Sequence, residues 1–215
     1  MKTSVSEGCC DSGRLRITTV HGCGIKVNTG QEKNLSSVST RLLNAFHLER
    51  LRNIRSLTLD VDGVLTDDTV WIGPDGFELK RFNISDGLGL ALMRDRLKIK
   101  IAVVSGRHSE ATTSRCSELR ISPIIQGEHD KRAGVRKVLR NHKVRAAQAA
   151  FVGNEILDLA AFHEVGFKIA VADAAPELVA QADLVLQRGG GQGVGRELFE
   201  LICRARGVDY VSWFA

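Results

Sequence analysis

The segment Leu57–Asp67 constrains the fold more than any other part of this sequence. It begins as a run of apolar residues typical of a buried strand, and it ends in Asp60 and Asp62, one residue apart and followed by glycine. Carboxylates at the end of a buried strand are costly unless a cation or hydrogen-bond donors face them. The segment therefore predicts a metal site, with one of the two acids as a candidate nucleophile.

Strands and helices are predicted to alternate from Ile54 onward. The turn signal Gly73–Gly76 separates two short apolar runs and predicts a hairpin over residues 69–82. The alternation predicts an α/β fold, Rossmann-like, with a central parallel sheet between two layers of helices. The expected strands are residues 56–61, 99–104, 121–125, 149–152, 168–171 and 184–186. The expected helices are residues 86–97, with Ser85 or Asp86 as the cap, and residues 109–119, 130–141, 157–164, 176–181 and 194–206.

The first part of the chain differs in composition from the rest. Residues 1–35 are rich in glycine, serine, threonine and asparagine and show no sustained period, so residues 1–50 are expected to form a flexible extension. Leu42, Phe46 and their neighbours recur at helical spacing, which predicts a helix near the end of this extension, with Ser36 or Ser39 as its cap. Residues 51–207 are then the folded domain and residues 208–215 a tail.

Composition limits the classes of partner. The net charge of +5 suits an anionic ligand, but with 5% aromatic residues it predicts no nucleic-acid partner. The five cysteines are odd in number and form no CxxC pair, and no apolar run reaches membrane-spanning length. These features predict a cytoplasmic protein without a membrane partner.

Polar residues end several of the predicted strands. In a parallel sheet ligands bind beyond the carboxyl ends of the strands, so Asp60, Asp62, Ser105 and Asn154 should converge, with Lys131 reaching them from a helix start. They fit phosphoryl transfer to an aspartate: Asp60 as nucleophile, Asp62 as acid and base, Ser105 and Lys131 as phosphate clamps, with Mg²⁺ screening the charges. The plainer readings are turn-forming acids, a solvated lysine and a helix-capping asparagine.

These residues also carry a family resemblance. Residues 60–66, 105–107, 131 and 153–158 resemble, in this order, the four motifs of the haloacid dehalogenase superfamily. The segments 82–87, 126–127 and 190–197 are similar to those of the phosphatases of 3-deoxy-D-manno-octulosonate 8-phosphate. The resemblance spans roughly residues 50–207.

The resemblance implies a function and a set of site residues. It implies a magnesium-dependent hydrolase of a phosphorylated keto-deoxy sugar acid, without a large cap domain, that forms a homotetramer in which small hairpin flaps close the sites. The implied metal ligands are Asp60, Asp62 and Asn154, and the implied substrate-binding residues are Asp62, Asn83, Ile84, Ser85, Asp86, Gly87, Arg107, Arg115 and Lys131.

The sequence departs from the family pattern at one motif. Gly153-Asn154-Glu155 stands where the family usually has Gly-Asp-Asp. The amide oxygen of Asn154 can still coordinate Mg²⁺ but brings no charge, so weaker metal affinity is expected. Two alternatives stay open: a phosphatase of a nine-carbon keto acid phosphate, and a phosphatase-like assembly module with weakened catalysis. Arg107 favours the eight-carbon substrate, because relatives that act on nine-carbon acids often carry glutamate there.

Overall fold

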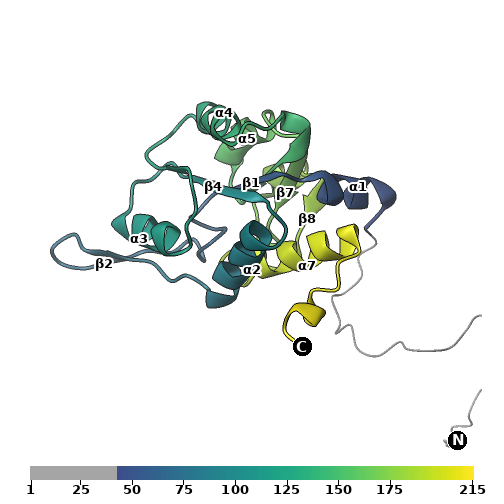
Figure 1. Cartoon of the computed structure of the whole chain (residues 1–215). Coiled ribbons are helices and arrows are strands. Elements are labelled where there is room, and N and C mark those ends of the chain that lie inside the picture. Colours follow the sequence, from purple (N-terminus) through teal and green to yellow (C-terminus); the bar gives the residue numbers. More distant parts are fainter. Residues whose placement is uncertain (1–42) are drawn as a thin grey trace, which may run out of the picture. The chain divides into compact units, whose positions relative to one another are not determined.

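A six-stranded parallel sheet forms the centre of the structure, a computed structural model that describes residues 43–215. The strand order is β5-β4-β1-β6-β7-β8, as expected for an α/β fold of βαβ units, and Figure 1 labels β4, β1, β7 and β8 of this sheet. Most of the extension predicted over residues 1–50, with both candidate caps, lies outside the described residues. The strands of this sheet are β1 (Ser56–Leu59), β4 (Lys100–Val104), β5 (Ile124–Ile125), β6 (Ala149–Gly153), β7 (Phe167–Ala170) and β8 (Leu184–Val185).

Strand β1 lies in the middle of this sheet. It pairs in parallel with β4 on one side and with β6 on the other, so that Leu59 is in register with both Val103 and Val152. All four residues of β1 are buried, which agrees with the apolar run in the sequence. The loops that follow β1, β4 and β6 therefore begin at neighbouring points on one edge of the sheet.

Helices cover both faces of the sheet, which confirms the predicted three-layer architecture (Figure 1). On one face Leu57 and Leu59 pack in a cluster with side chains of α1, α2 and α7. On the other, Phe151 packs in a second cluster with side chains of α4, α5 and α6. The helices are α1 (Ala45–Asn53), α2 (Ile84–Asp95), α3 (Glu110–Glu118), α4 (Lys131–His142), α5 (Leu159–Phe162), α6 (Pro176–Val179) and α7 (Val194–Arg206).

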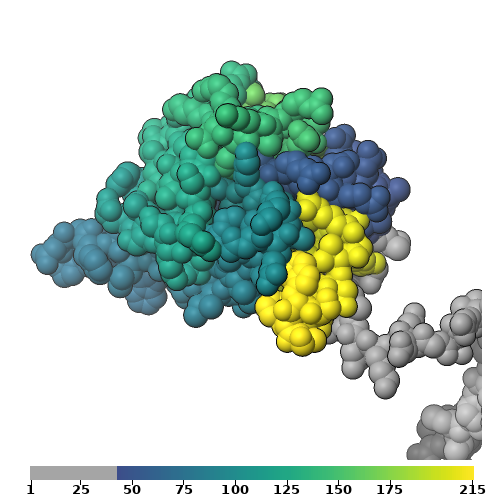
Figure 2. Space-filling view, in the orientation of Figure 1, coloured from purple at the N-terminus to yellow at the C-terminus, as the bar shows by residue number. Residues whose placement is uncertain are grey.

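The predicted hairpin is present and is smaller than expected. Strands β2 (Trp71–Ile72) and β3 (Glu78–Leu79) pair antiparallel, and Figure 2 shows this region standing out from the body of the domain at the left. It is the only regular secondary structure in the fully described stretch between β1 and α2. The prediction of a small flap without a large cap domain is therefore confirmed.

The start of α2 differs from the prediction. Ser85 or Asp86 was expected to cap a helix beginning at residue 86, but α2 begins at Ile84 and its cap is Asn83, whose Oδ1 accepts the N–H of Ser85 at 2.8 Å. The carboxylate of Asp86 instead accepts the N–H of Gly195 at 2.6 Å, at the start of α7. That prediction of the cap was wrong, because Asp86 is used between two helices and not within one.

The strand and helix limits otherwise shift by a few residues. The strand expected over residues 56–61 ends at Leu59, and only the last two residues of the strand expected over 121–125 pair. Helix α7 has the predicted bounds. No helix among residues 43–215 is long and apolar enough to cross a membrane. The predicted limits of the folded domain (51–207) and of the tail (208–215) stay predictions.

Candidate active site

Lys131 joins two carboxylates at the edge of the sheet. Its Nζ lies 2.8 Å from Oδ1 of Asp60, which directly follows β1, and 3.1 Å from Oδ1 of Asp158, in the loop after β6. The same Nζ donates a hydrogen bond to the carbonyl oxygen of Val104 at 3.0 Å, at the end of β4. Two carboxylates and one carbonyl oxygen thus surround this ammonium group at the ends of three neighbouring strands.

The sequence explains why Lys131 lies there. It is the first residue of α4, and Asp130 caps that helix by accepting the N–H groups of Arg132 and Ala133. The residue is only 4% exposed, unlike most lysines. The reading of Lys131 as a solvated surface lysine is therefore wrong, and the prediction that it reaches the crevice is consistent with its position.

The charges at this point do not balance. Burial, with the negative charge of Asp158, raises the pKa of Asp60 to about 7, against the lowering effect of Lys131. Burial alone would lower the pKa of Lys131, but Asp60 and Asp158 raise it above its usual value. Two buried carboxylates share one ammonium group, and a further cation would ease the ionisation of Asp60.

Asp62 is held by a residue that the sequence reading missed. Lys80 of the hairpin places its Nζ 2.6 Å from Oδ1 of Asp62, and its side chain is fully buried. The other carboxylate oxygen of Asp62, Oδ2, is buried without a hydrogen-bond partner among the described residues. A signal existed in the sequence, since Glu78 and Lys80 alternate with the apolar residues Phe77 and Leu79 along the expected strand.

Asn154 follows β6 and faces the loop after β1. Its side-chain oxygen, Oδ1, is buried and has no hydrogen-bond partner in the described part of the chain. Asp158 holds the loop by accepting the backbone N–H of Asn154 at 3.0 Å and that of Glu155 at 3.3 Å. Gly63 has φ +75°, and a Cβ there would lie 1.9 Å from Nδ2 of Asn154, so glycine lets the two loops meet.

Ser105 follows β4 and is 2% exposed. Its Oγ accepts the N–H of Arg107 at 3.3 Å, which closes a tight turn between the strand and α3. Because Val104 also accepts a hydrogen bond from Lys131, Ser105 is one residue away from the lysine contact. The structure therefore brings four of the predicted residues to neighbouring strand ends and places Lys131 against one of them.

The predicted metal ligands offer oxygen donors of the right kind. Asp60, Asp62 and Asn154 supply two carboxylates and one amide, and two of their oxygens are buried without partners among residues 43–215. No group of three or more histidine, cysteine, aspartate or glutamate side chains in these described residues could hold a metal ion. Mg²⁺ uses few protein oxygens and keeps several waters, so this small set fits it better than it fits a metal held only by protein ligands.

The predicted substrate residues at the start of α2 form a separate group. Arg115 donates to the carbonyl oxygen of Asn83 at 3.3 Å and pairs with Glu118 at 2.8 Å. Gly87 makes room for it, since a Cβ there would lie 2.4 Å from its Nη2. Ile84 is 83% exposed. Ser85 is also exposed, and Asp86 is turned toward α7.

Within residues 43–215, Arg107 pairs with the hairpin and not with the start of α2. Its Nη2 forms an ion pair with Oε2 of Glu78 at 2.6 Å, and about half of its side chain is exposed. The guanidinium group thus lies at the loop that follows β4, where its exposed N–H groups can bind an anionic group. No direct contact joins Arg107 or the α2 group to Lys131 among the contacts of the described residues.

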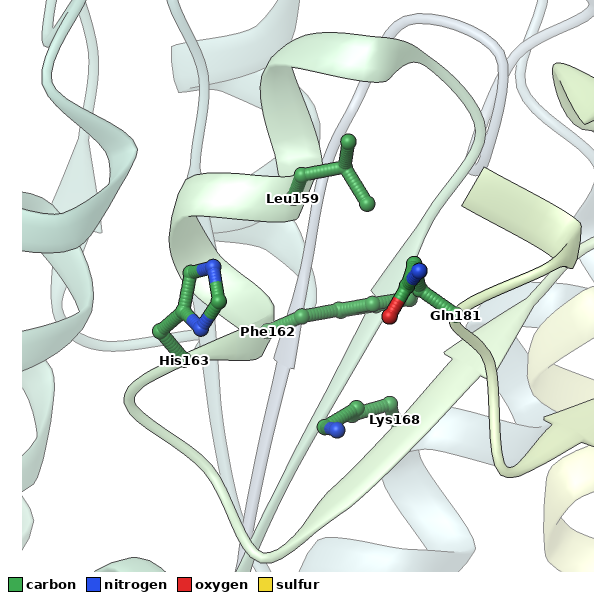
Figure 3. Close-up of a pocket in the computed structure, with 5 residues that line it drawn as sticks. All are labelled: Leu159, Phe162, His163, Lys168 and Gln181. Carbon is green, nitrogen blue, oxygen red and sulfur yellow. The ribbon is translucent and has the colours of Figure 1, made fainter. Parts of the chain in front are cut away.

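A surface pocket elsewhere contains none of the predicted site residues. Figure 3 shows side chains of α5 on one side of it and Lys168 of β7 and Gln181 on the other. Its walls are mainly apolar, and none of the buried acids described above reaches it. The chemistry that the sequence predicts is therefore placed at the carboxyl edge of the sheet and not in this pocket.

Residues 93–198 match the family model of the haloacid dehalogenase-like hydrolases. The 3-deoxy-D-manno-octulosonate 8-phosphate phosphatase of Escherichia coli (strain K12) is 38% identical over 162 residues, which are 74% of this chain and 85% of that protein. This chain belongs to the haloacid dehalogenase-like hydrolases. The recognition of the family from its ordered motifs is confirmed.

Solved structures of haloacid dehalogenase-like hydrolases resemble this one. The corresponding phosphatase of Moraxella catarrhalis, solved in complex with a magnesium ion, a phosphate ion and a KDO molecule, has a TM-score of 0.73 at 32% identity and covers 78% of this chain and 95% of its own. A cobalt-bound octulosonate 8-phosphate phosphatase of Haemophilus influenzae has a TM-score of 0.73 at 35% identity and covers 77% and 98%. The similarity thus extends over nearly the whole length of these relatives.

Proposed function

We propose that this protein is a magnesium-dependent phosphatase that converts 3-deoxy-D-manno-octulosonate 8-phosphate to 3-deoxy-D-manno-octulosonate and phosphate. One observation carries the proposal: Lys131 links Asp60 to Asp158 beside Ser105, at the edge of the sheet where an α/β fold binds its ligand. The relatives with 38% identity bear the name of this activity, and they support the choice of substrate.

In the proposed reaction Asp60 is the nucleophile. One of its oxygens forms a bond to phosphorus while the bond from phosphorus to the sugar oxygen breaks, which leaves an aspartyl-phosphate. Asp62 gives a proton to the departing sugar oxygen and then takes one from a water molecule. That water attacks phosphorus, releases phosphate and restores Asp60. Ser105 and Lys131 hold the phosphoryl oxygens throughout.

Asp60, Asp62 and Asn154 would hold the metal ion. When bound, Mg²⁺ supplies positive charge that lowers the repulsion between the Asp60 carboxylate and the phosphate. The unpartnered oxygens of Asp62 and Asn154 support this assignment, as does the raised pKa of Asp60. Asn154 brings no charge, so we expect a weak site that fills only at high magnesium concentration.

The sugar acid carries a carboxylate as well as a phosphate. Arg107 and Arg115 offer forked donors that suit carboxylates, and the polar start of α2 offers backbone groups for hydroxyls. Further assigned to substrate binding are Asp62, Asn83, Ile84, Ser85, Asp86, Gly87 and Lys131. Of these residues, Asp86 is the least available for direct contact with the substrate, because its carboxylate already accepts a hydrogen bond from Gly195 at the start of α7. A cytoplasmic location for this reaction stays a prediction from the sequence.

The hairpin supports a homotetramer as the active form. Trp71 and Ile72 are 70% and 68% exposed, and Phe77 and Leu79 are 65% and 54% exposed. A patch of large apolar side chains on a projecting hairpin is typical of a surface that another protein chain covers. A second copy of this chain is the partner that the family resemblance implies.

A phosphate panel tests the proposal. We expect hydrolysis of the eight-carbon keto acid phosphate to exceed that of a nine-carbon one, to require Mg²⁺, and to fall by at least about 1,000-fold in Asp60→Asn. Asp75→Asn, an exposed aspartate in the hairpin turn, is the control and should keep wild-type turnover. Faster turnover of the nine-carbon substrate would favour that alternative, and no hydrolysis at high magnesium would favour the assembly module.

A further inference from the structure

Lys80 connects the hairpin to the candidate site. Its side chain is fully buried, although residues on either side of it in the hairpin are exposed. Its Nζ lies 2.6 Å from Oδ1 of Asp62, 3.4 Å from Oγ1 of Thr112 and 3.6 Å from Oε1 of Glu78. A lysine seldom loses all contact with water, and it does so where fixed acceptors replace that water.

The alternation of side chains along β3 produces this contact. Phe77 and Leu79 are 65% and 54% exposed, whereas Glu78 and Lys80 turn toward the domain. Glu78 pairs with Arg107 at 2.6 Å. With the Lys80–Asp62 pair, the inner face of the hairpin thus makes two ion pairs with residues predicted to act in the site. The hairpin is therefore attached to the site by its polar face and presents its apolar face outward.

The contact restricts one half of the Asp62 carboxylate. Oδ1 is held by Lys80, while Oδ2 is buried and has no partner among residues 43–215. A carboxylate fixed through one oxygen presents the other in a defined direction. Proton transfer by such a group depends on its placement to within a fraction of an ångström.

We propose that Lys80 is a positioning residue: it orients Asp62 and couples the hairpin to the site. The catalytic part of this inference rests on the proposed function, whereas the coupling part rests on the contacts alone. The alternative is an ion pair that only stabilises the hairpin. The two roles predict different effects of removing the ammonium group: only a positioning residue should lower kcat at saturating substrate.

Lys80→Ala tests the proposal by steady-state kinetics with 3-deoxy-D-manno-octulosonate 8-phosphate at saturating Mg²⁺. We expect kcat to fall by about 10- to 100-fold while KM changes by less than about threefold, because the orientation of Asp62 is lost and substrate contacts are kept. Ethylammonium ions, which fit the space left by the side chain, should restore part of kcat. A purely structural role would give no such rescue.

Two control variants show whether the effect on kcat is specific to Lys80 or follows from the loss of any cationic side chain. Lys137 makes an ion pair of the same length, 2.6 Å to Glu128, on the exposed surface of α4. Arg81, also of the hairpin, pairs at 2.7 Å with Asp67 in the loop after β1. Lys137→Ala and Arg81→Ala should keep wild-type kcat. An unchanged kcat in Lys80→Ala, a fall of the same size in Arg81→Ala, or a rise in KM alone would overturn the proposal.

Hydrogen exchange tests the coupling without turnover. In the wild type the amides of Val64, Leu65 and Thr66 donate to the carbonyl oxygen of Val61, next to Asp62. Lys80→Ala should speed their exchange by at least about threefold, while exchange in the strands of the central sheet stays unchanged. Unchanged exchange at these amides would overturn the coupling. A wild type that hydrolyses no sugar acid phosphate would contradict only the proposed function.

Discussion

Asn154 is the residue at which this chain departs from the usual motif of its family. An aspartate there would add a charge beside Gly63, in the loop that carries Asp62, and metal affinity for oxygen sites rises with the number of charged ligands. We expect Asn154→Asp to lower the magnesium concentration for half-maximal rate by about tenfold. The variant should also show a larger rise in melting temperature on addition of Mg²⁺, because a ligand that binds only the folded state stabilises it.

Asn141 provides the matched control for this change. It is an exposed asparagine at the end of α4, and Asn141→Asp adds the same charge away from the candidate metal site. Its magnesium requirement should equal that of the wild type. If Asn154→Asp also left the requirement unchanged, residue 154 would not be a metal ligand.

The raised pKa of Asp60 predicts a pH-dependent effect on stability in the metal-free protein. In the unfolded chain the carboxyl group of Asp60 loses its proton near pH 4, whereas in the folded protein it keeps the proton until about pH 7. Ionisation of Asp60 therefore reduces the stability of the folded protein as pH rises through this window. Asp60→Asn removes that loss. Its melting temperature relative to wild type should therefore increase between pH 4 and pH 8, as followed by circular dichroism with a chelator present. A constant difference would contradict the raised pKa.

Single residues also show what the sequence could and could not predict. Asp60 and Lys131 were predicted to converge because each ends or begins an element at the same edge of the sheet, and they lie 2.8 Å apart. Lys80 was not predicted, since its contact joins it to Asp62, 18 positions away, across a loop whose path the sequence does not determine. The use of Asp86 at α7 was also missed, because it joins residues 109 positions apart.

At the scale of elements, α2 and α7 pack through glycine. A Cβ at Gly89 would lie 2.3 Å from the carbonyl oxygen of Gly195, which is backbone and cannot turn aside. Alanine is the better helix former by about 1 kcal/mol, but overpacking a helix contact costs about 1–3 kcal/mol. We expect the clash to dominate, so Gly89→Ala should destabilise the protein in chemical denaturation.

Gly73→Ala is a suitable control for this prediction. The nearest atom to a Cβ at Gly73 is the carbonyl oxygen of Phe77 at 3.6 Å, an ordinary contact distance. This variant should unfold at the wild-type denaturant concentration. An increase in stability for Gly89→Ala would mean that helix propensity outweighs the packing at this crossing.

Most elements could be predicted from the sequence because apolar runs and turn signals mark them. Strand β6 and helix α7 lie within a residue of the expected limits. The ends of β1 and β5 could not be predicted, because pairing with neighbouring strands decides where a strand stops. The cap at Asn83 was missed for a related reason: several polar residues precede α2, and only the backbone path selects one of them.

At the scale of the whole molecule, the projecting hairpin predicts assembly. We expect a tetramer by light scattering at micromolar concentration, and a smaller species for the double variant Trp71→Ser and Phe77→Ser, which removes two of the exposed apolar side chains. The thermal stability of the domain should change little, because both side chains are exposed in the single chain. Asp75→Ser in the hairpin turn is the control and should remain tetrameric. A monomeric wild type would contradict the predicted assembly.

The central claim is that phosphate passes through a covalent bond to Asp60. Rapid quenching during turnover, followed by borohydride reduction, converts an aspartyl-phosphate to homoserine, which peptide mass spectrometry can place in the sequence. We expect homoserine at position 60 only when both Mg²⁺ and the eight-carbon sugar acid phosphate are present. Homoserine at Asp62 or Asp158, or its absence from every carboxylate during active turnover, would contradict the account.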